Sequence, residues 1–326
     1  MNADAVIATD ITPASRKGSA GADRLFQFVT AGAAWFVLLL LGGVAVSMAW
    51  GGRLAFQTFG WHFITGKDWD VVGAKFGAFV PVYGTLVTSA IALIIAVPVS
   101  IGIALFLTDI APRWTRGPIA IAIELLAAIP SIIYGMWGLF VFAPFMAAHV
   151  EPWLGDHLGN KPVIGALFSG PPIGIGMLTA GIVLGIMVIP FIASVAREVF
   201  SAVPPPLKES AVALGSTRWE ILSRVTLPYT RSAIIGAIFL GLGRALGETM
   251  AVTFVLGNAH DLSASLLMPS NSIAAAIANE FTEADTDLYR SSLIALGFLL
   301  FVVTFIVLTI AKLLLLRINK QMGRTH

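Results

Sequence analysis

The chain has 326 residues, of which 57% are hydrophobic and only 12% are charged. Soluble domains carry about 25% charged residues, so this composition excludes an ordinary soluble domain. The net charge of +2 gives no reason to expect nucleic acid as a partner, and the lack of cysteine excludes disulfides, thiolate catalysis and cysteine metal sites.

Six segments are long and apolar enough to cross a membrane, which takes about 20 mostly apolar residues. They lie at about residues 25–52, 80–108, 117–148, 173–196, 232–257 and 291–316. Prolines lie inside three of them and are expected to kink the helices: Pro98, Pro130 and Pro190. The first segment follows a polar stretch and has no small-residue cleavage site, so we expect a retained helix and not a signal peptide. The sequence predicts an all-α, polytopic membrane protein with a six-span domain at 25–316 between tails at 1–24 and 317–326.

Lysine and arginine are distributed unequally between the connecting segments. Fourteen lie in the two tails, near the end of the sixth segment (Lys312) and in the second-to-third and fourth-to-fifth loops, whereas five lie in the other connections. The remaining one, Arg244, lies inside the fifth segment. Because segments rich in Lys and Arg stay in the cytoplasm, this bias predicts that both termini are cytoplasmic.

The predicted outward loops differ in character. Residues 53–79 and 150–172 contain glycine and aromatic residues, whereas residues 258–290 are polar and contain four acids: Glu280, Glu283, Asp285 and Asp287. Such loops either contact an external partner or are ordinary solvated connections.

The fourth-to-fifth loop, residues 204–228, is predicted to form a helical hairpin on the cytoplasmic face. Three prolines end the preceding helix, residues 207–214 read as a short helix, and Gly215 is a suitable C-terminal cap. A second helical piece at 219–225 is expected to end at Pro228. This hairpin suits a docking partner; the alternative is an amphipathic interfacial helix without one.

The same loop resembles the EAA loop of ABC-importer permeases, whose pattern is Glu-Ala-Ala, three residues, Gly, nine residues, Ile-x-Leu-Pro. The matching residues are Glu209, Ser210, Ala211, Gly215, Leu227 and Pro228. Ser210 and Val225 replace Ala and Ile of the pattern, and both changes are small. The resemblance implies that residues 204–228 are the coupling loop that docks onto a separate ATPase subunit.

Two further stretches are similar to the PstC-type permease subunits of phosphate ABC importers. These are Gly-Arg-Ala-Leu-Gly-Glu-Thr-Met-Ala-Val-Thr-Phe-Val-Leu-Gly-Asn at 243–258 and Ile-Pro-Ser-Ile-Ile-Tyr-Gly at 129–135. The resemblance implies a multi-pass subunit of the bacterial cytoplasmic (inner) membrane, surrounded by lipid. It also implies three protein partners: a homologous PstA-like permease, a PstB-like ATP-binding subunit and an external PstS-like phosphate-binding protein. ATP and Mg would be bound by the ATPase, so no cofactor is expected in this chain.

Arg244 and Glu248 are ionisable residues inside the otherwise uncharged fifth segment, where charged groups usually mark a transport path. In a continuous helix they lie one turn apart on one face, and Gly243 and Gly247 form a Gly-x-x-x-Gly motif that lets another helix approach. The planar guanidinium of arginine donates paired hydrogen bonds to oxyanions, so we expect Arg244 to bind the substrate. The alternative is an Arg244–Glu248 pair that only holds the bundle together.

Glu124 is a carboxylic acid predicted inside the third span. It would pair with Arg244, face a cytoplasmic vestibule or contact the partner permease, and these placements make it a candidate pathway residue. The alternative is an acid near the interface whose carboxylate reaches water.

The function expected from this sequence is ATP-driven import of inorganic phosphate by alternating access. Neither a P-loop nor a His-Glu-x-x-His motif occurs, so we expect no metal site and no enzymatic activity in this chain. Alternatives are import of another oxyanion (sulfate, molybdate or phosphonate), a stand-alone secondary anion transporter and a membrane scaffold without transport.

Overall fold

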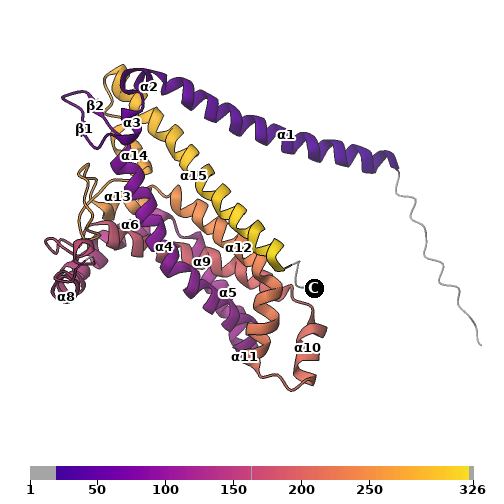
Figure 1. Cartoon of the computed structure of the whole chain (residues 1–326). Coiled ribbons are helices and arrows are strands. Elements are labelled where there is room, and N and C mark those ends of the chain that lie inside the picture. The colour runs from indigo at the N-terminus through magenta and orange to yellow at the C-terminus, as the bar shows by residue number, and fades with distance from the viewer. Residues whose placement is uncertain (1–19, 163, 323–326) are drawn as a thin grey trace, which may run out of the picture. The chain divides into compact units, whose positions relative to one another are not determined.

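The computed structural model describes residues 20–162 and 164–322, and the chain divides into two units at residues 47 and 48. Within its described residues, the first unit consists of most of helix α1 (Ala20–Gly51). The second unit holds all the other elements (Figure 1). Most of the predicted tail 1–24 and the end of the tail 317–326 lie outside the described residues. The described parts of both tails are helical, since α1 begins at Ala20 and α15 (Asp287–Met322) runs beyond residue 317.

The prediction of six apolar helices is confirmed. Helices long and apolar enough to cross a membrane cover Asp23–Gly51, Phe79–Ile110, Ser131–Leu158, Met177–Ser201, Arg218–Leu246 and Asp287–Arg317. Pro98 and Pro190 lie inside continuous helices, α4 (Phe79–Leu105) and α9 (Met177–Ser201). The first, second, fourth and sixth helices occupy nearly the predicted positions, but the third and fifth do not.

The predicted third span at 117–148 is wrong as a single helix. Helix α5 (Arg113–Ala128) ends where Ile129 and Pro130 adopt extended ψ angles of 129° and 135°. A second helical run then covers 131–158; it comprises α6 (Ser131–Trp137), α7 (Ala143–Phe145) and α8 (Glu151–Leu158), joined by π-helical turns. Proline lacks an N–H and disfavours helix at the preceding residue, so Pro130 breaks the segment where a kink was expected.

The predicted fifth span at 232–257 is also divided differently. Helix α11 (Arg218–Ile221) continues through a π-helical turn (Leu222–Thr226) into α12 (Leu227–Leu246), so Pro228 does not end the helix as predicted. Proline is tolerated there because the wider turn before it already departs from the regular α-helical bonding. Helix α12 instead ends at Gly247, and a separate helix α13 (Met250–Leu256) follows.

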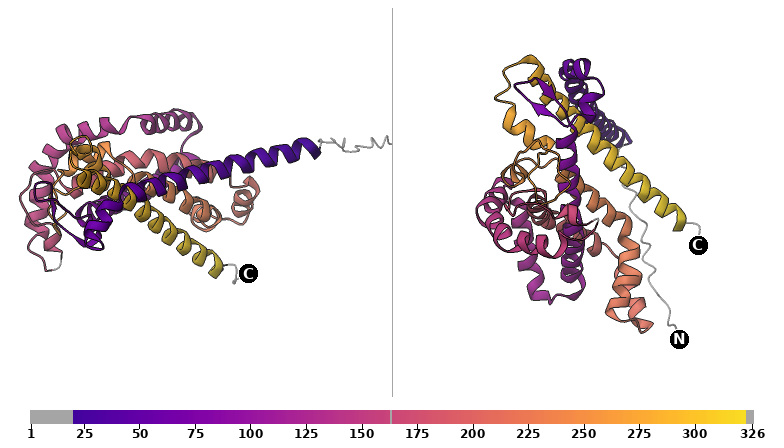
Figure 2. Two further views of the ribbon diagram at one scale, coloured as in Figure 1. Left: turned by 90° about the horizontal axis from the view of Figure 1, so that it is seen from above. Right: turned by 60° about the vertical axis from the view of Figure 1, so that its left-hand side comes forward.

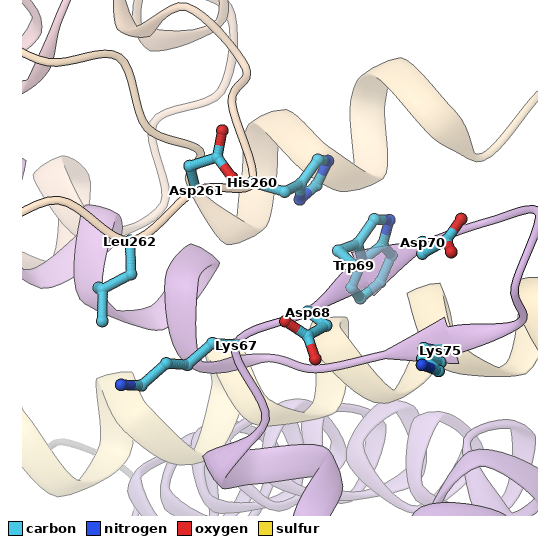
Figure 3. A pocket seen from close by; sticks show the side chains of 8 residues that line it. All are labelled: Lys67, Asp68, Trp69, Asp70, Lys75, His260, Asp261 and Leu262. Atoms are coloured by element: carbon cyan, nitrogen blue, oxygen red, sulfur yellow. The ribbon is translucent and has the colours of Figure 1, made fainter.

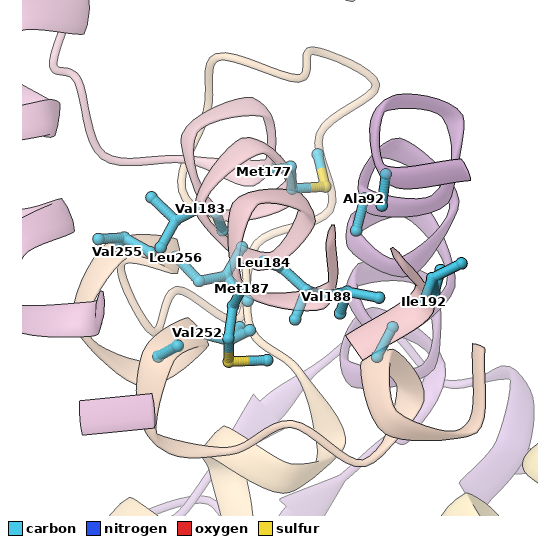
Figure 4. Close-up of a cluster of buried hydrophobic side chains, with 14 residues drawn as sticks. Ala92, Met177, Val183, Leu184, Met187, Val188, Ile192, Val252, Val255 and Leu256 are labelled. Carbon is cyan, nitrogen blue, oxygen red and sulfur yellow. The ribbon is translucent and has the colours of Figure 1, made fainter. Parts of the chain in front are cut away.

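Helix α9 lies at the centre of the second unit. Its side chains form a buried core with those of α4 and α13, and ten of the residues are labelled in Figure 4: Ala92, Met177, Val183, Leu184, Met187, Val188, Ile192, Val252, Val255 and Leu256. Glycine allows α9 and α4 to approach closely, because a Cβ atom at Gly181 would lie only 2.6 Å from the Cβ atom of Ile91. This core fixes the helices from which the candidate site is built.

The two ends of the second unit carry different structures (Figures 1 and 2). At one end lie α2 (Arg53–Phe59), α3 (His62–Thr65), the hairpin of β1 (Trp69–Asp70) and β2 (Lys75–Phe76), and α14 (Ile273–Glu280). At the other end lie α10 (Pro205–Ala213) and α11, within residues 204–228, the predicted coupling loop. The coupling loop and the acidic loop 258–290 therefore lie at opposite ends, in agreement with the distribution of Lys and Arg along the sequence. Which side of the membrane each end faces stays a prediction.

Candidate transport site and coupling loop

Arg244 lies in the last turn of α12, exposed in this chain. Its guanidinium carbon lies 5.6 Å from the centre of the Phe191 ring on α9, which is a cation–π distance. Among the described residues, no carboxylate lies within 4.0 Å of its guanidinium nitrogens. The arginine is thus held against an aromatic face while its hydrogen-bond donors have no carboxylate partner.

Glu248 does not lie on the same helix as Arg244, so the predicted one-turn spacing is wrong. Gly247 ends α12, and Glu248 lies in the link before α13, where its Oε1 accepts a hydrogen bond from the N–H of Ala251 at 3.3 Å. A carboxylate is stabilised beside the N–H groups of a helix start, which explains this placement. The alternative of an Arg244–Glu248 ion pair is therefore also wrong for this chain.

The predicted packing role of Gly243 and Gly247 is not found within the described chain. No heavy atom lies within 4 Å of a Cβ atom built on Gly243, and Gly247 meets only the carbonyl oxygen of Gly243, at 3.6 Å. Close packing occurs instead at Gly241, where a Cβ atom would lie 2.6 Å from the Ile192 side chain. The face of α12 that bears Gly243 and Arg244 is open in the isolated subunit.

Glu124 lies on α5 and pairs with Arg197 on α9, with 2.6 Å between Oε1 and Nη2. The predicted alternative of pairing with Arg244 is therefore wrong. The two side chains are 54% and 27% exposed, and such exposed pairs contribute about 1 kcal/mol at most. Whether Glu124 contributes to the pathway stays a prediction.

The coupling loop has the helix–glycine–helix form that its sequence predicts. Gly215 has a φ of +83°, and the N–H groups of Gly215 and Ser216 donate to the carbonyls of Val212 and Ala211 in a Schellman cap. Thr217 then begins α11 through a capping box with Glu220. These caps hold the two short helices in a defined turn.

The motif residues of the coupling loop serve two different surfaces. Glu209, Ser210 and Gly215 are exposed, whereas Ala211 is buried and Leu227 packs against a core cluster beneath the hairpin. Large apolar side chains are also exposed on the loop: Leu207, Val212, Leu214 and Trp219. Exposed apolar side chains on a rigid, capped hairpin are typical of a surface that a partner protein covers.

Glu280 joins several segments at the end of the second unit that carries the β1–β2 hairpin. Its carboxylate accepts hydrogen bonds from the indole N–H of Trp69 at 2.8 Å and the hydroxyl of Tyr289 at 2.7 Å, and it lies 3.0 Å from His260 Nε2. The Trp69 and His260 rings stack at 5.5 Å and line a groove of about 480 Å³ (Figure 3). The sequence places Glu280 only among the acids of its own loop and does not reveal this cluster, because Trp69 and the other partners are distant along the chain.

The environment of Glu280 lowers the pKa of its carboxyl. Burial alone would raise the pKa. The hydrogen bonds from His260, Tyr289 and Trp69, together with the charge of His260, have the larger combined effect and lower it. The folded state therefore favours the carboxylate. Its stabilisation is complete above the pKa of an unfolded glutamate, about 4.3, and is lost as the pH falls through the lower folded value.

Glu280→Gln is expected to lower the free energy of unfolding by about 1–3 kcal/mol, since buried donors lose a charged acceptor. Thermal unfolding of both proteins in detergent, measured between pH 7 and pH 3.5, checks this. The difference in unfolding temperature should be largest near pH 7 and shrink below about pH 4. The matched control is Glu283→Gln, which removes an exposed acid of the same loop. An equal destabilisation by both variants would contradict the role of Glu280.

Six apolar helices with a capped helical hairpin at one end define this chain as a polytopic membrane protein. Residues 96–320 match the family model described as binding-protein-dependent transport system inner membrane component. The phosphate transport system permease protein PstC of Xylella fastidiosa is 60% identical over 96% of each chain. That of Mesorhizobium japonicum is 56% identical over 92% of each chain. The chain therefore belongs to the binding-protein-dependent transport permease family, and within it to the PstC-type permeases.

A solved bacterial alginate ABC transporter, in complex with an alginate-bound periplasmic protein, contains a chain with the same fold. The TM-score is 0.58 at 19% identity, and the alignment covers 91% of this chain and 95% of the other. At this identity the likeness concerns the fold alone.

Proposed function

We propose that this chain is a permease subunit of a bacterial ABC importer and carries inorganic phosphate across the cytoplasmic membrane. Relatives named as phosphate transport permeases are 56–60% identical over almost the whole chain, which supports phosphate as the substrate. The observation that carries the mechanism is Arg244, an arginine at the end of an apolar helix with no carboxylate within ion-pair distance among the described residues.

The donors of Arg244 suit a tetrahedral oxyanion, because a guanidinium presents two parallel N–H groups to two anion oxygens. Glu248 would otherwise compete for them, but its carboxylate accepts from Ala251 instead. The ring of Phe191 holds the guanidinium from its face and leaves the N–H edges free to bind phosphate. Gly247 and Thr249 link α12 to α13, so the two helices are able to change their angle during alternating access.

Four kinds of subunit would form the importer. A homologous PstA-like permease would complete the pathway, and an external PstS-like protein would deliver phosphate. A PstB-like subunit would bind ATP and Mg and dock on the coupling loop, so ATP hydrolysis would reside outside this chain. The exposed apolar side chains of the coupling loop, Leu214 and Trp219 above all, support this docking.

Reconstitution in lipid vesicles tests the proposal. The complex of the two permeases and the ATPase, supplied with the binding protein and ATP on the correct sides, is expected to accumulate labelled phosphate. Omission of this chain, of ATP or of the binding protein should each abolish accumulation. A stand-alone secondary transporter would instead accumulate phosphate without the ATPase, and a scaffold would support assembly without any flux.

A further inference from the structure

An ion pair joins the coupling loop to the second membrane helix. Lys208 lies on α10, and Asp109 lies in the π-helical turn Phe106–Ile110 that ends the helix begun by α4. The Lys208 Nζ and Asp109 Oδ1 atoms are 2.6 Å apart, and the side chains are only 25% and 19% exposed. The other oxygen of Asp109 accepts a hydrogen bond from the Thr108 hydroxyl at 3.2 Å, so both carboxylate oxygens have partners.

Helix α10 is separated from its neighbours along the chain, and the capped turn at Gly215 fixes its angle to α11. Pro204 precedes it with an extended ψ of 128°, and Gly215 follows it with a positive φ, so the helix is interrupted at both ends. The capped turn passes movement of α10 to α11 and α12, whereas the second membrane helix is not continuous with the loop, so movement reaches that helix through side chains. Lys208 and Ala211 are three residues apart, so they share one face of α10, and they are the less exposed residues of that helix.

This face is turned toward the bundle, and its partner on the second helix is well anchored. The helix that contains Asp109 begins as α4, which packs against the central helix α9. The other short ion pair at this end, Glu124–Arg197, joins α5 to α9 and does not involve the coupling loop. Charge-assisted contacts of this length are strong and directional, unlike apolar contacts that slide, and a partly buried charge left alone is destabilised.

We propose that the Lys208–Asp109 ion pair makes α10 and the end of the second membrane helix move as one body. Motion imposed on α10 by an ATPase would then be passed directly to the second helix. This role rests on the proposed docking of an ATPase on the coupling loop. Asp109 and Lys208 are positioning residues, since neither is placed in contact with phosphate.

The first test measures the phosphate imported per ATP hydrolysed in vesicles that contain the complete importer. Asp109→Asn and Lys208→Met are each expected to lower this ratio at least fivefold, while the complex still assembles and hydrolyses ATP. The exchanged pair, Asp109→Lys with Lys208→Asp, should recover at least half of the ratio. The matched control is Glu198→Gln, an exposed acid in the last turn of α9, which should change nothing. A merely structural role would reduce assembly and hydrolysis together with import.

A ratio within twofold of the unmodified importer in both single variants would overturn the proposal, and so would an exchanged pair no better than they are. If the single variants fail to assemble, the double variant Asp109→Cys with Lys208→Cys, bridged by a bifunctional thiol reagent, decides the matter. The chain has no native cysteine, so the bridge is specific. Bridged complexes should import at least fivefold better than unbridged ones, and no gain would overturn the proposal.

A labelling experiment that needs no phosphate tests the role of the ion pair independently of the proposed substrate. Ile110 is 49% exposed beside Asp109. The thiol introduced by Ile110→Cys should react with a water-soluble maleimide at a different rate when ATP is added. Asp109→Asn is expected to abolish that change, and an undiminished change would overturn the proposal. If the unmodified complex imports no phosphate, the proposed substrate fails, while the labelling still decides the mechanical link.

Discussion

Replacement of Arg244 by glutamine is expected to lower phosphate uptake by a factor of roughly 30 or more. An arginine that donates paired hydrogen bonds to a bound anion contributes about 2–5 kcal/mol, and 1.4 kcal/mol is a factor of ten. Glutamine keeps a polar side chain but loses the charge and the planar fork. Assembly should not change, because Arg244 is exposed, its guanidinium lies against the Phe191 ring and it forms no ion pair with a carboxylate among the described residues.

The measurement is ATP-driven uptake of labelled phosphate, with assembly checked by co-purification of the ATPase. Arg53→Gln is the matched control. The Arg53 guanidinium lies 4.6 Å from the Trp50 ring and makes the same kind of contact at the opposite end from the coupling loop. This control should retain uptake within about twofold. Full uptake by Arg244→Gln would remove Arg244 from the transport path.

Replacement of Gly215 by valine is expected to reduce the affinity of the ATPase about tenfold or more. An L-residue in the left-handed conformation costs about 1–2 kcal/mol, and a β-branched residue is the least suited to it. No atom lies within 4 Å of a Cβ atom at Gly215, so any effect comes from the backbone and not from a clash. The Schellman cap would open, and α10 would lose its fixed angle to α11.

Titration of the purified permease pair with the ATPase subunit measures this loss, and uptake should fall in parallel. Gly102→Val in α4 is the control, because Gly102 also has free space around its Cβ position but lies in an ordinary helix. Equal ATPase affinity for Gly215→Val and the unmodified chain would show that the shape of the hairpin does not matter for docking.

The features that were predictable from the sequence are those encoded locally. A run of about 20 apolar residues is enough to identify a membrane helix, so all six were found. Gly215 was identified as a cap because a positive φ after a short helix favours glycine wherever it occurs. Pro130 shows the limit, since hydropathy alone does not separate a kink from a break at two consecutive extended residues, Ile129 and Pro130.

The site was less predictable because its geometry depends on helix continuity and on distant partners. The spacing of Arg244 and Glu248 was interpreted as one helical face, whereas the helix ends at Gly247 and the two side chains have separate partners. Lys208 and Asp109 are 99 residues apart, and Glu280 and Trp69 are 211 apart. Neither pair follows any local pattern, so only the packing of the helices brings them together.

Competition between anions is the measurement that tests phosphate import by this chain most directly. Uptake of labelled phosphate into vesicles that contain the complete importer is recorded with excess unlabelled phosphate, sulfate, molybdate or a phosphonate. The proposed function predicts that phosphate alone suppresses the signal and that uptake depends on Arg244. Equal suppression by sulfate or molybdate, or saturable ATP-driven uptake of one of those anions in place of phosphate, would contradict it.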